Sequence, residues 1–324
     1  MTHRVALRRR SAIQILNSHP QKAQFHARTI HQTDNKPQDP RLPTSDKVVE
    51  ELIEDKFALL KSAYDAPKHP IILAHGLLGF DELHLIPGKV LPGIEYWYGI
   101  TQALAAKKIE VITAAVPPSG SIEARAAKLA ETIALKANGK AVNIIAHSMG
   151  YAIKPENVKV LSLTTVATPH RGSSFADYIF KGIGVPNIPK VYKALDFIGM
   201  ETGAFRQLTQ KYMAESFNLR TPDVPGIRYY SYGASMPHPH LFSLFRKPHR
   251  VIEGLEGPND GLVSVASSRW GEYKGTLNHV SHLDLINWTN RLRWYWWSVT
   301  GRKRNFNAIA FYLSIADMLA KEGL

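Results

Sequence analysis

The sequence predicts an α/β fold with a mostly parallel central sheet, helices on both faces and one helical insertion. Short apolar runs alternate with helix-forming segments between residues 70 and 167, which is the pattern of parallel strands joined by crossover helices. One apolar run, Ala141–Ala146, leads directly into Ala-His-Ser-Met-Gly at positions 146–150. This pattern is typical of a buried strand that turns sharply into a helix and leaves Ser148 at the tip of the turn.

Ser148 is the candidate nucleophile. A serine hydroxyl is a weak nucleophile, so it must be exposed on a tight turn with a base within reach. The small residues Ala146 and Gly150 leave room for such a turn. An ordinary strand followed by a glycine-containing turn would give the same pentapeptide, so the surrounding sequence has to decide between the two interpretations.

Composition limits the alternatives. A chain of 324 residues with 44% hydrophobic and 21% charged residues suits one large globular domain with appended segments. The absence of cysteine excludes disulfides, a thiol nucleophile and a zinc–thiolate site. No apolar run approaches the roughly 20 residues of a spanning helix, so any membrane contact is expected to be peripheral. The net charge of +13 comes without a nucleic-acid recognition motif, and no nucleic-acid partner is predicted.

The chain divides into three parts. Residues 1–33 contain several arginines and one lysine but no acidic residue, and apolar residues among them can share one helical face. This amphipathic, basic profile predicts a mitochondrial targeting segment, and a basic disordered or nucleic-acid-binding tail is the alternative. Residues 34–46 are rich in proline and polar residues and predict a linker. Residues 47–324 form the predicted α/β domain.

Within that domain, the pattern predicts a leading helix over residues 47–64 and then alternating strands and helices. The predicted strands are Ile71–Ala74, Glu110–Val116, Ala141–Ala146, Val158–Ala167 and Ile227–Tyr232. Residues 93–104 predict an aromatic loop that runs into a helix. Two further helices are predicted, one over 122–137 with Ser121 as its N-cap and one over 308–319. Because parallel strands share one carboxyl edge, a ligand site is expected beyond that edge.

The loop after the first of these strands supplies a candidate oxyanion hole. His75-Gly76-Leu77 follows the strand directly, and a glycine there lets the backbone approach a ligand closely. The backbone N–H groups of Leu77 and Met149 are the candidate donors to a negatively charged oxygen. A simple tight turn at His-Gly is the alternative interpretation.

Two residues late in the chain are candidates for the acid and the base. Asp260 lies in an Asn-Asp-Gly segment that predicts a turn, and His282 follows it in the chain. The order Ser148, Asp260, His282 is one of the known chain orders of a serine nucleophile, carboxylate and histidine base. His279 competes with His282 for the role of base, and Asp260 in a plain turn is the other alternative.

Residues 174–222 interrupt the alternation of strands and helices. They are rich in aromatic and aliphatic side chains at helical spacing and contain no strand pattern. Two interpretations remain open: ordinary core helices packed on the sheet, or a lid whose apolar underside closes over a pocket in water and opens at a lipid surface.

Five segments occur in the order found in a known family. They are His75-Gly-Leu-Leu-Gly-Phe, Tyr96-Trp-Tyr-Gly-Ile, Val116-Pro-Pro-Ser-Gly-Ser, Ala146-His-Ser-Met-Gly and Thr168-Pro-His-Arg-Gly-Ser. Over residues 68–297 the sequence resembles the bacterial true lipases and the fungal mitochondrial triacylglycerol lipases. The resemblance implies an α/β-hydrolase fold and lipid ester substrates. It also implies that His282, which precedes Leu-Asp, is the base, and that His170 is structural.

The resemblance also bears on metals and on the C-terminal segment. Some bacterial relatives hold calcium near this histidine, and Asp284 matches one of its carboxylates, but Trp288 stands where a polar ligand is expected. We therefore expect no structural metal and no cofactor. The aromatic and basic segment from Trp288 onward predicts either a closing packed helix or an interfacial patch.

One departure from the family concerns the segment after Ser148. Pro155 follows closely, whereas the resembling lipases have a helix of about three turns there, and a proline cannot occupy a helix interior. The helix is expected to be a stub. The predicted function is a triacylglycerol lipase-like ester hydrolase whose partners are acylglycerols or other lipid esters at a membrane or lipid-droplet surface. The alternative is a catalytically weak or silent hydrolase-fold protein.

Overall fold

The structure is a computed structural model, which describes residues 52–76, 82–83, 94–114, 116–117, 120–148, 158–182, 206–241, 243–288 and 306–324. The predicted targeting segment (1–33) and linker (34–46) lie outside the described residues.

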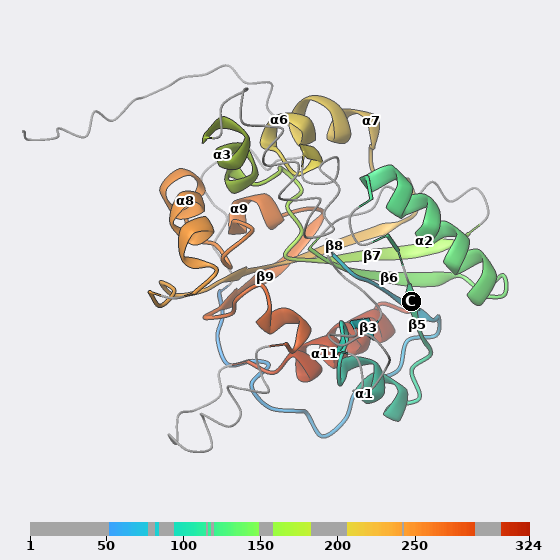
Figure 1. The fold of residues 1–324 in the computed structure, drawn as a ribbon. Coiled ribbons are helices and arrows are strands. Elements are labelled where there is room, and N and C mark those ends of the chain that lie inside the picture. The colour runs from blue at the N-terminus through green and yellow to red at the C-terminus, as the bar shows by residue number, and fades with distance from the viewer. Residues whose placement is uncertain are drawn as a thin grey trace, which may run out of the picture. The chain divides into compact units, whose positions relative to one another are not determined.

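A seven-stranded sheet in the order β1-β9-β8-β7-β6-β2-β5 organises the domain, and every neighbouring pair in it is parallel (Figure 1). Its strands are β1 (Leu52–Ile53), β2 (Ile71–Ala74), β5 (Val111–Ala114), β6 (Val142–His147), β7 (Val160–Val166), β8 (Arg228–Ser235) and β9 (Glu272–Asn278). Strands β3 (Glu82–Leu83) and β4 (Ile94–Glu95) form a separate antiparallel pair. The five strands predicted from the sequence are confirmed as β2, β5, β6, β7 and β8.

Helices cover both faces of the sheet. Those of the described residues are α1 (Ile100–Ala106), α2 (Ile122–Lys136), α3 (Ser174–Gly182), α6 (Gln210–Tyr212), α7 (Asn218–Arg220), α8 (Arg246–Glu256), α9 (Val265–Ser268) and α11 (Ala308–Lys321), with a π-helical turn η2 (Met213–Phe217) and a 3-10 turn η3 (Asp284–Ile286). Figure 1 shows α1 and α11 on one face and the other α-helices on the opposite face. Strands β2 and β6 are buried at every residue because both faces are covered.

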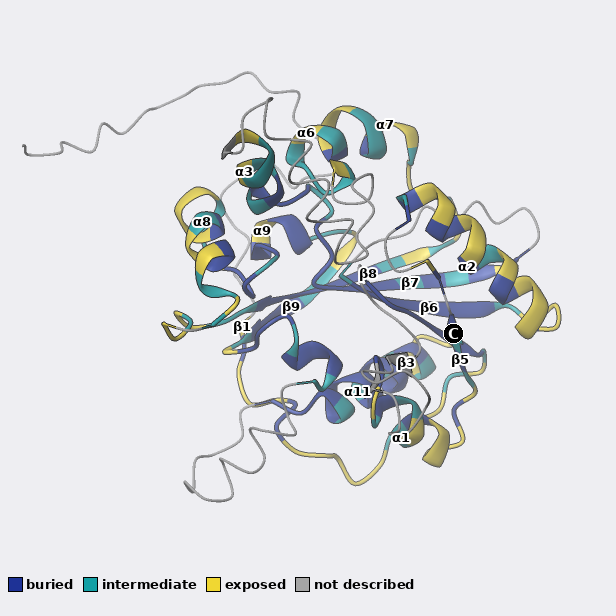
Figure 2. Cartoon of the chain, viewed as in Figure 1, coloured by how far each residue is buried: buried dark blue, intermediate teal, exposed yellow. Residues whose placement is uncertain are grey.

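Two predicted helices are confirmed at their expected places. Helix α2 begins where Ser121 accepts a hydrogen bond from the backbone N–H of Ala124, so the serine caps the helix as predicted. Helix α11 is buried along most of its length (Figure 2), and its aromatic residues Phe311 and Tyr312 are fully covered. Residues 308–319 therefore pack as a closing helix. The aromatic and basic residues of 294–304 lie outside the described residues.

The prediction of a helix over residues 47–64 is wrong in its described part. Residues 52–53 form strand β1, which pairs in parallel with β9, and a turn follows in which Asp55 has a φ of 44°. The apolar residues Ile53 and Phe57 are buried in the core. Pairing with the open edge of the sheet satisfies the backbone, and this non-local contact prevails over local helical spacing.

The insertion at 174–222 is helical where it is described. Helices α3, α6, η2 and α7 come from it and no strand does within its described residues, while 183–205 lie outside the description. Met213 and Ile122 form a small buried cluster that joins the insertion to α2. Across the described part of the chain, no helix has both the length and the apolar character needed to cross a membrane.

The crossover from β6 to β7 is short. Only residues 148–159 connect the two strands, and α2 packs on one face of the sheet beside them. On that face a mainly apolar cavity of about 90 Å³ is lined by Ile144 and Leu163 of the sheet and by Phe217 of η2, among others. The stub predicted near Pro155 lies outside the described residues.

Candidate active site

Ser148 occupies a strained position at the carboxyl end of β6. Its φ is 67°, in the left-handed region that residues other than glycine rarely adopt. Its backbone N–H donates to the Val166 carbonyl oxygen at 2.9 Å, which fixes the residue against the end of β7. The side chain is only partly buried. The backbone therefore turns at the serine, and the residue is left partly exposed at the end of the strand.

The end of β2 approaches this turn closely. A Cβ atom added to Gly76 would lie 2.5 Å from the Ser148 Cβ atom and 3.0 Å from its Oγ atom. Only glycine fits there without displacement of the serine. The Gly76 N–H donates to the Tyr96 hydroxyl at 3.2 Å. The candidate oxyanion donors Leu77 and Met149, one residue beyond Gly76 and Ser148, lie outside the described residues.

The loop between α8 and α9 presents Asp260 to His282. The His282 Nδ1 atom lies 2.7 Å from Asp260 Oδ2, and both side chains are buried. The other carboxylate oxygen, Oδ1, accepts the backbone N–H groups of Leu262 and Val263 at 3.0 and 2.8 Å. In addition, the His282 N–H donates to the Asp260 carbonyl oxygen at 2.9 Å. The carboxylate is thus held on both oxygens, and it directs a proton to Nδ1 so that Nε2 of a neutral ring is left as an acceptor.

His147 links this pair to the strand that carries Ser148. Its ring centroid is 4.6 Å from that of His282, and its Nδ1 atom shares a hydrogen bond of 2.7 Å with the Tyr96 hydroxyl. Although both side chains are described, no hydrogen bond joins Ser148 Oγ to His282. Such contacts are often long in unliganded enzymes and shorten when a substrate binds.

Buried, uncharged histidines surround the serine. Burial, and secondarily the positive charge that His282 can carry, holds the pKa of His147 well below its usual value. Burial likewise lowers the pKa of His75 to about 4. His75 Nδ1 donates to the Gly76 carbonyl oxygen, and its Nε2 accepts the Val116 N–H at 3.4 Å. Both rings are therefore neutral near pH 7 and act as rigid supports.

Arg125 holds the same loop from the opposite side. This fully buried side chain on α2 donates through Nη2 to the carbonyl oxygens of His75 and Gly76, at 2.7 and 3.0 Å, and through Nη1 to that of Pro117. The supporting roles of Arg125, Tyr96 and His147 were not predicted. Tyr96 and His147 lie in two of the five motif segments, but their contacts with each other and with the loop form only after the strands have paired.

The other predicted residues lie elsewhere. His279 is exposed with a φ of 59°, and its backbone N–H is bonded to the Asn278 side chain. The ring of His170 is stacked on Trp270 at 5.0 Å, and its Nε2 contacts Thr165 Oγ1 at 2.9 Å. These two histidines thus contact residues outside the group formed by Ser148, His147 and His282.

Asp284, the match to a calcium ligand, accepts hydrogen bonds from within its own turn. Its Oδ2 atom lies 2.9 Å from the Ser281 N–H and 2.7 Å from the Ser281 hydroxyl. The carboxylate therefore contributes to the start of η3, directly after His282.

The strand order and the crossover helices define an α/β-hydrolase. Solved structures with the same fold include the lipase of Staphylococcus hyicus, with a TM-score of 0.56 and 20% identity over 80% of this chain and 98% of that one. A metagenomic carboxyl esterase has a TM-score of 0.60 and 16% identity over 80% of this chain and 78% of that one.

Sequence comparison is more specific. Triacylglycerol lipase 2 of Saccharomyces cerevisiae is 37% identical over 331 aligned positions, which cover 86% of this chain and 99% of that protein. A triacylglycerol lipase of Vibrio cholerae is 28% identical over 71% of this chain and 83% of that protein. No protein-family model matches the sequence. The chain belongs to the triacylglycerol lipase family, as the five ordered motifs indicate.

Proposed function

We propose that the chain hydrolyses carboxylic esters of acylglycerols through Ser148, His282 and Asp260. The observation that carries the proposal is the buried Asp260–His282 hydrogen bond of 2.7 Å, whose histidine ring lies 4.6 Å from that of His147, the residue before a serine held at a φ of 67°. Membership of the lipase family supports the substrate class. A nucleophile on a sharp turn and a histidine oriented by a carboxylate are the parts that acyl transfer needs.

In the proposed first step, His282 Nε2 accepts the hydroxyl proton of Ser148 while Oγ attacks the ester carbonyl carbon. The carbonyl oxygen becomes an oxyanion, for which the backbone N–H groups of Leu77 and Met149 are the proposed donors. Asp260 keeps Nδ1 protonated and stabilises the imidazolium that forms. The intermediate collapses when His282 returns the proton to the leaving alcohol oxygen, which leaves an acyl group on Ser148.

In the second step, water replaces the alcohol. His282 accepts a proton from the water, whose oxygen attacks the acyl carbon, and then returns that proton to Ser148 Oγ as the fatty acid leaves. Each proton transfer uses a group of the chain itself, so the proposed reaction needs no cofactor.

Replacement of His282 and of His279 by glutamine tests the assignment of the base. We expect His282→Gln to lower kcat for a short-chain ester by about 10³-fold or more, because the serine loses its proton acceptor. His279→Gln serves as the matched control because that ring is exposed, and it should leave kcat within about twofold. An equal loss in the two variants, with both folded, would contradict the assignment.

Access of the substrate is proposed to occur from a lipid surface. The segment after the carboxyl end of β8 exposes Leu241 and Leu244 to 61% and 93%, and α8, which follows it, contacts α3 of the insertion. Exposed leucines at the edge where the substrate must enter favour peripheral contact with a membrane or lipid droplet. Under this proposal the helical insertion at 174–222 acts as a lid.

A double change to Leu241→Asp and Leu244→Asp tests surface contact. We expect slower hydrolysis of an emulsified triacylglycerol and unchanged hydrolysis of a dissolved short-chain ester, because only the first reaction requires the interface. Equal rates of wild type and variant on the emulsion would exclude these residues from lipid contact.

The competing candidate function is a weak or silent hydrolase-fold protein. The short connection between β6 and β7 favours it, because the segment that ordinarily anchors the nucleophile turn has little length here.

Localisation in mitochondria is a further proposal, which rests on the basic, acid-free residues 1–33.

A further inference from the structure

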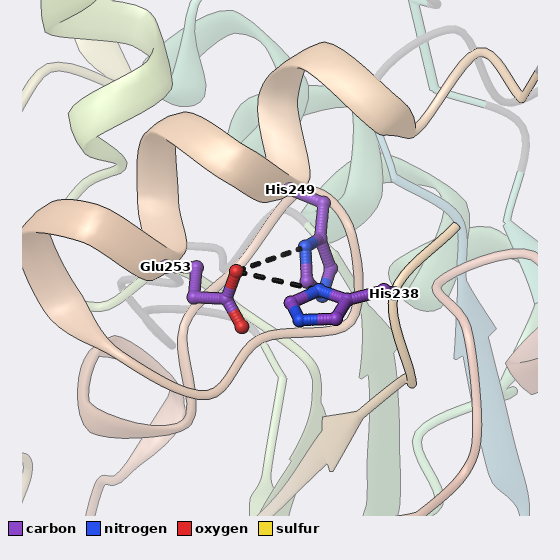
Figure 3. A group of neighbouring side chains, drawn as sticks. All are labelled: His238, His249 and Glu253. Carbon is purple, nitrogen blue, oxygen red and sulfur yellow. Dashed lines mark ion pairs between the residues drawn. The ribbon is translucent and has the colours of Figure 1, made fainter. Parts of the chain in front are cut away.

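Three side chains near the end of β8 converge on one point (Figure 3). His249 and Glu253 project from successive turns of α8, and His238 projects toward them from the segment after β8. The Oε2 atom of Glu253 lies 3.4 Å from His238 Nδ1 and 3.8 Å from His249 Nδ1. One ligand atom from each of the three residues lies within 4.8 Å of the others.

The spacing of these atoms suits a small divalent cation. Zinc binds imidazole nitrogen at about 2.0–2.1 Å and carboxylate oxygen at about 2.0–2.2 Å, so its tetrahedral ligands lie about 3.3–3.5 Å from one another. The two distances to Glu253 are 3.4 and 3.8 Å, close to that spacing, and all three ligand atoms lie within 4.8 Å of one another, so rotation of the side chains would bring them to a central ion. Two nitrogens and one oxygen are ligands that zinc accepts together.

The surroundings of His249 orient it as a ligand. Its Nε2 atom faces the Met236 carbonyl oxygen at 3.3 Å, and since a carbonyl only accepts, Nε2 carries the proton. In the neutral ring this leaves the Nδ1 lone pair directed toward Glu253. A backbone carbonyl on the far nitrogen is the usual outer partner of a metal-bound histidine. The lone pair and the carboxylate oxygen are both acceptors, so a metal ion between them would bind both.

Two of the three side chains are open to solvent, so an ion could reach the group. The His249 side chain is 4% exposed, whereas those of Glu253 and His238 are 43% and 79% exposed. A cation can therefore enter from solvent, and water can complete its coordination. Because His249 and Glu253 are fixed on one helix, binding would draw His238 and the segment after β8 onto α8.

We propose that His238, His249 and Glu253 form a structural site for a divalent transition-metal ion, best suited to Zn²⁺. Its role follows from its neighbours. Asn259, the residue before Asp260, donates its side-chain N–H to the His249 carbonyl oxygen at 3.2 Å, and the Met236 N–H donates to the Asn259 carbonyl oxygen at 2.9 Å. An ion at this point holds together the two segments that support Asn259. This site is distinct from the Asp284 position considered in the sequence analysis.

Direct titration of the untagged full-length chain with Zn²⁺ tests the proposal. The variants are His238→Gln and Glu253→Gln, which keep a similar side-chain size while removing one ligand each. His240→Gln is the matched control, since His240 is exposed in the same segment. The other histidines of the chain, among them those of residues 1–33, are the same in wild type and in every variant, so any Zn²⁺ that they bind does not differ among them.

We expect wild type and His240→Gln to bind one equivalent of Zn²⁺ and to melt several degrees higher with the ion than after chelation. Each ligand variant should bind at least tenfold more weakly and lose most of the shift. Co²⁺ in place of Zn²⁺ should give the intense visible absorption of a tetrahedral site in wild type and His240→Gln, and not in the two ligand variants. The proposal is overturned by saturable binding that persists unchanged in both ligand variants, or by an absence of saturable binding to the wild type, where a protonated histidine would pair with Glu253 instead.

Discussion

The close approach of Gly76 to Ser148 makes the glycine itself a determinant of activity. In Gly76→Ala the added methyl would lie 2.5 Å from the Ser148 Cβ atom and 2.9 Å from the His147 carbonyl oxygen. Since these atoms belong to two paired strands, the clash must move the serine or its neighbour. We predict a loss of at least tenfold in kcat/KM and a fall of about 1–3 kcal/mol in the free energy of unfolding.

Ester hydrolysis and urea unfolding of the purified variant measure both quantities. Gly254→Ala is the control, because that glycine lies in α8 with no heavy atom near its added methyl, and alanine there should stabilise slightly. Full activity of Gly76→Ala would show that the serine turn tolerates displacement.

The buried histidines predict a loss of stability in acid. Because burial lowers the pKa of His75 to about 4, the unfolded chain binds a proton more readily than the folded one between that value and the ordinary 6.5. Stability conferred by the neutral ring is present above about pH 6.5 and is lost as the pH falls toward about 4, by at most about 3 kcal/mol. His147, with its pKa also lowered, acts in the same direction.

Urea unfolding of wild type and His75→Gln at about pH 7, 6 and 5 measures this dependence. We expect the slope of stability against pH to be smaller in the variant, whose side chain does not titrate. His279→Gln, which removes an exposed ring, should keep the wild-type slope. Parallel slopes for His75→Gln and wild type would show that His75 does not couple folding to pH.

At the scale of single elements, sequence pattern predicted what local contacts decide. The predicted strand Ile71–Ala74 and the Ser121 cap of α2 are both confirmed, because a continuous apolar run and a capping serine depend on residues that are adjacent in the sequence. The helix expected over 47–64 is wrong because the pairing of β1 with β9 joins residues more than 200 positions apart. No spacing within the segment could reveal that edge.

The same distinction holds for the sites. Ser148 and Asp260 could be selected because turn motifs and chain order mark them, whereas His282 was preferred to His279 only through the family resemblance, and all three roles remain proposals. Tyr96, which contacts both Gly76 and His147, could not be selected in this way. The metal-binding group proposed at His238 and on α8 was also missed, since its three residues form no recognised spacing motif.

The length of the connection between β6 and β7 is expected to limit both activity and stability. An insertion of about seven helix-forming residues between Gly150 and Tyr151 would supply the roughly two helical turns that the resembling lipases have at this place. It would cross the face where Ile144 and Leu163 line an apolar cavity. We predict at least tenfold higher ester hydrolysis, about 1.4 kcal/mol in the barrier, and a higher melting temperature, because the added helix would pack into the apolar cavity.

A glycine- and serine-rich insert of the same length at the same place is the control, since it adds chain without adding a helix. Activity and melting temperature that match the wild type in both insertion variants would show that the strand and the turn alone hold Ser148 in place.

At the scale of the whole molecule, residues 1–33 are proposed to direct the chain to mitochondria. A fusion of residues 1–40 to a fluorescent reporter should accumulate there, because the segment combines positive charge with a possible apolar face. Replacement of Arg8, Arg9 and Arg10 by glutamate should abolish this, and replacement by lysine should preserve it. Nuclear accumulation of the fusion would favour a basic tail of another kind. Fluorescence microscopy against a mitochondrial marker distinguishes these outcomes.

The central proposal is that this lipase-family chain forms an acyl-enzyme on Ser148. Its most direct test is reaction of the folded chain with a fluorophosphonate, which labels activated serines, followed by mass spectrometry of the peptides. We predict one adduct on the peptide that contains Ser148, no adduct in Ser148→Ala, and at least tenfold slower labelling in Asp260→Asn, because the hydrogen bond that orients His282 is impaired. A folded wild-type chain that takes no label, or a Ser148→Ala variant that is labelled as fast as wild type, would contradict it.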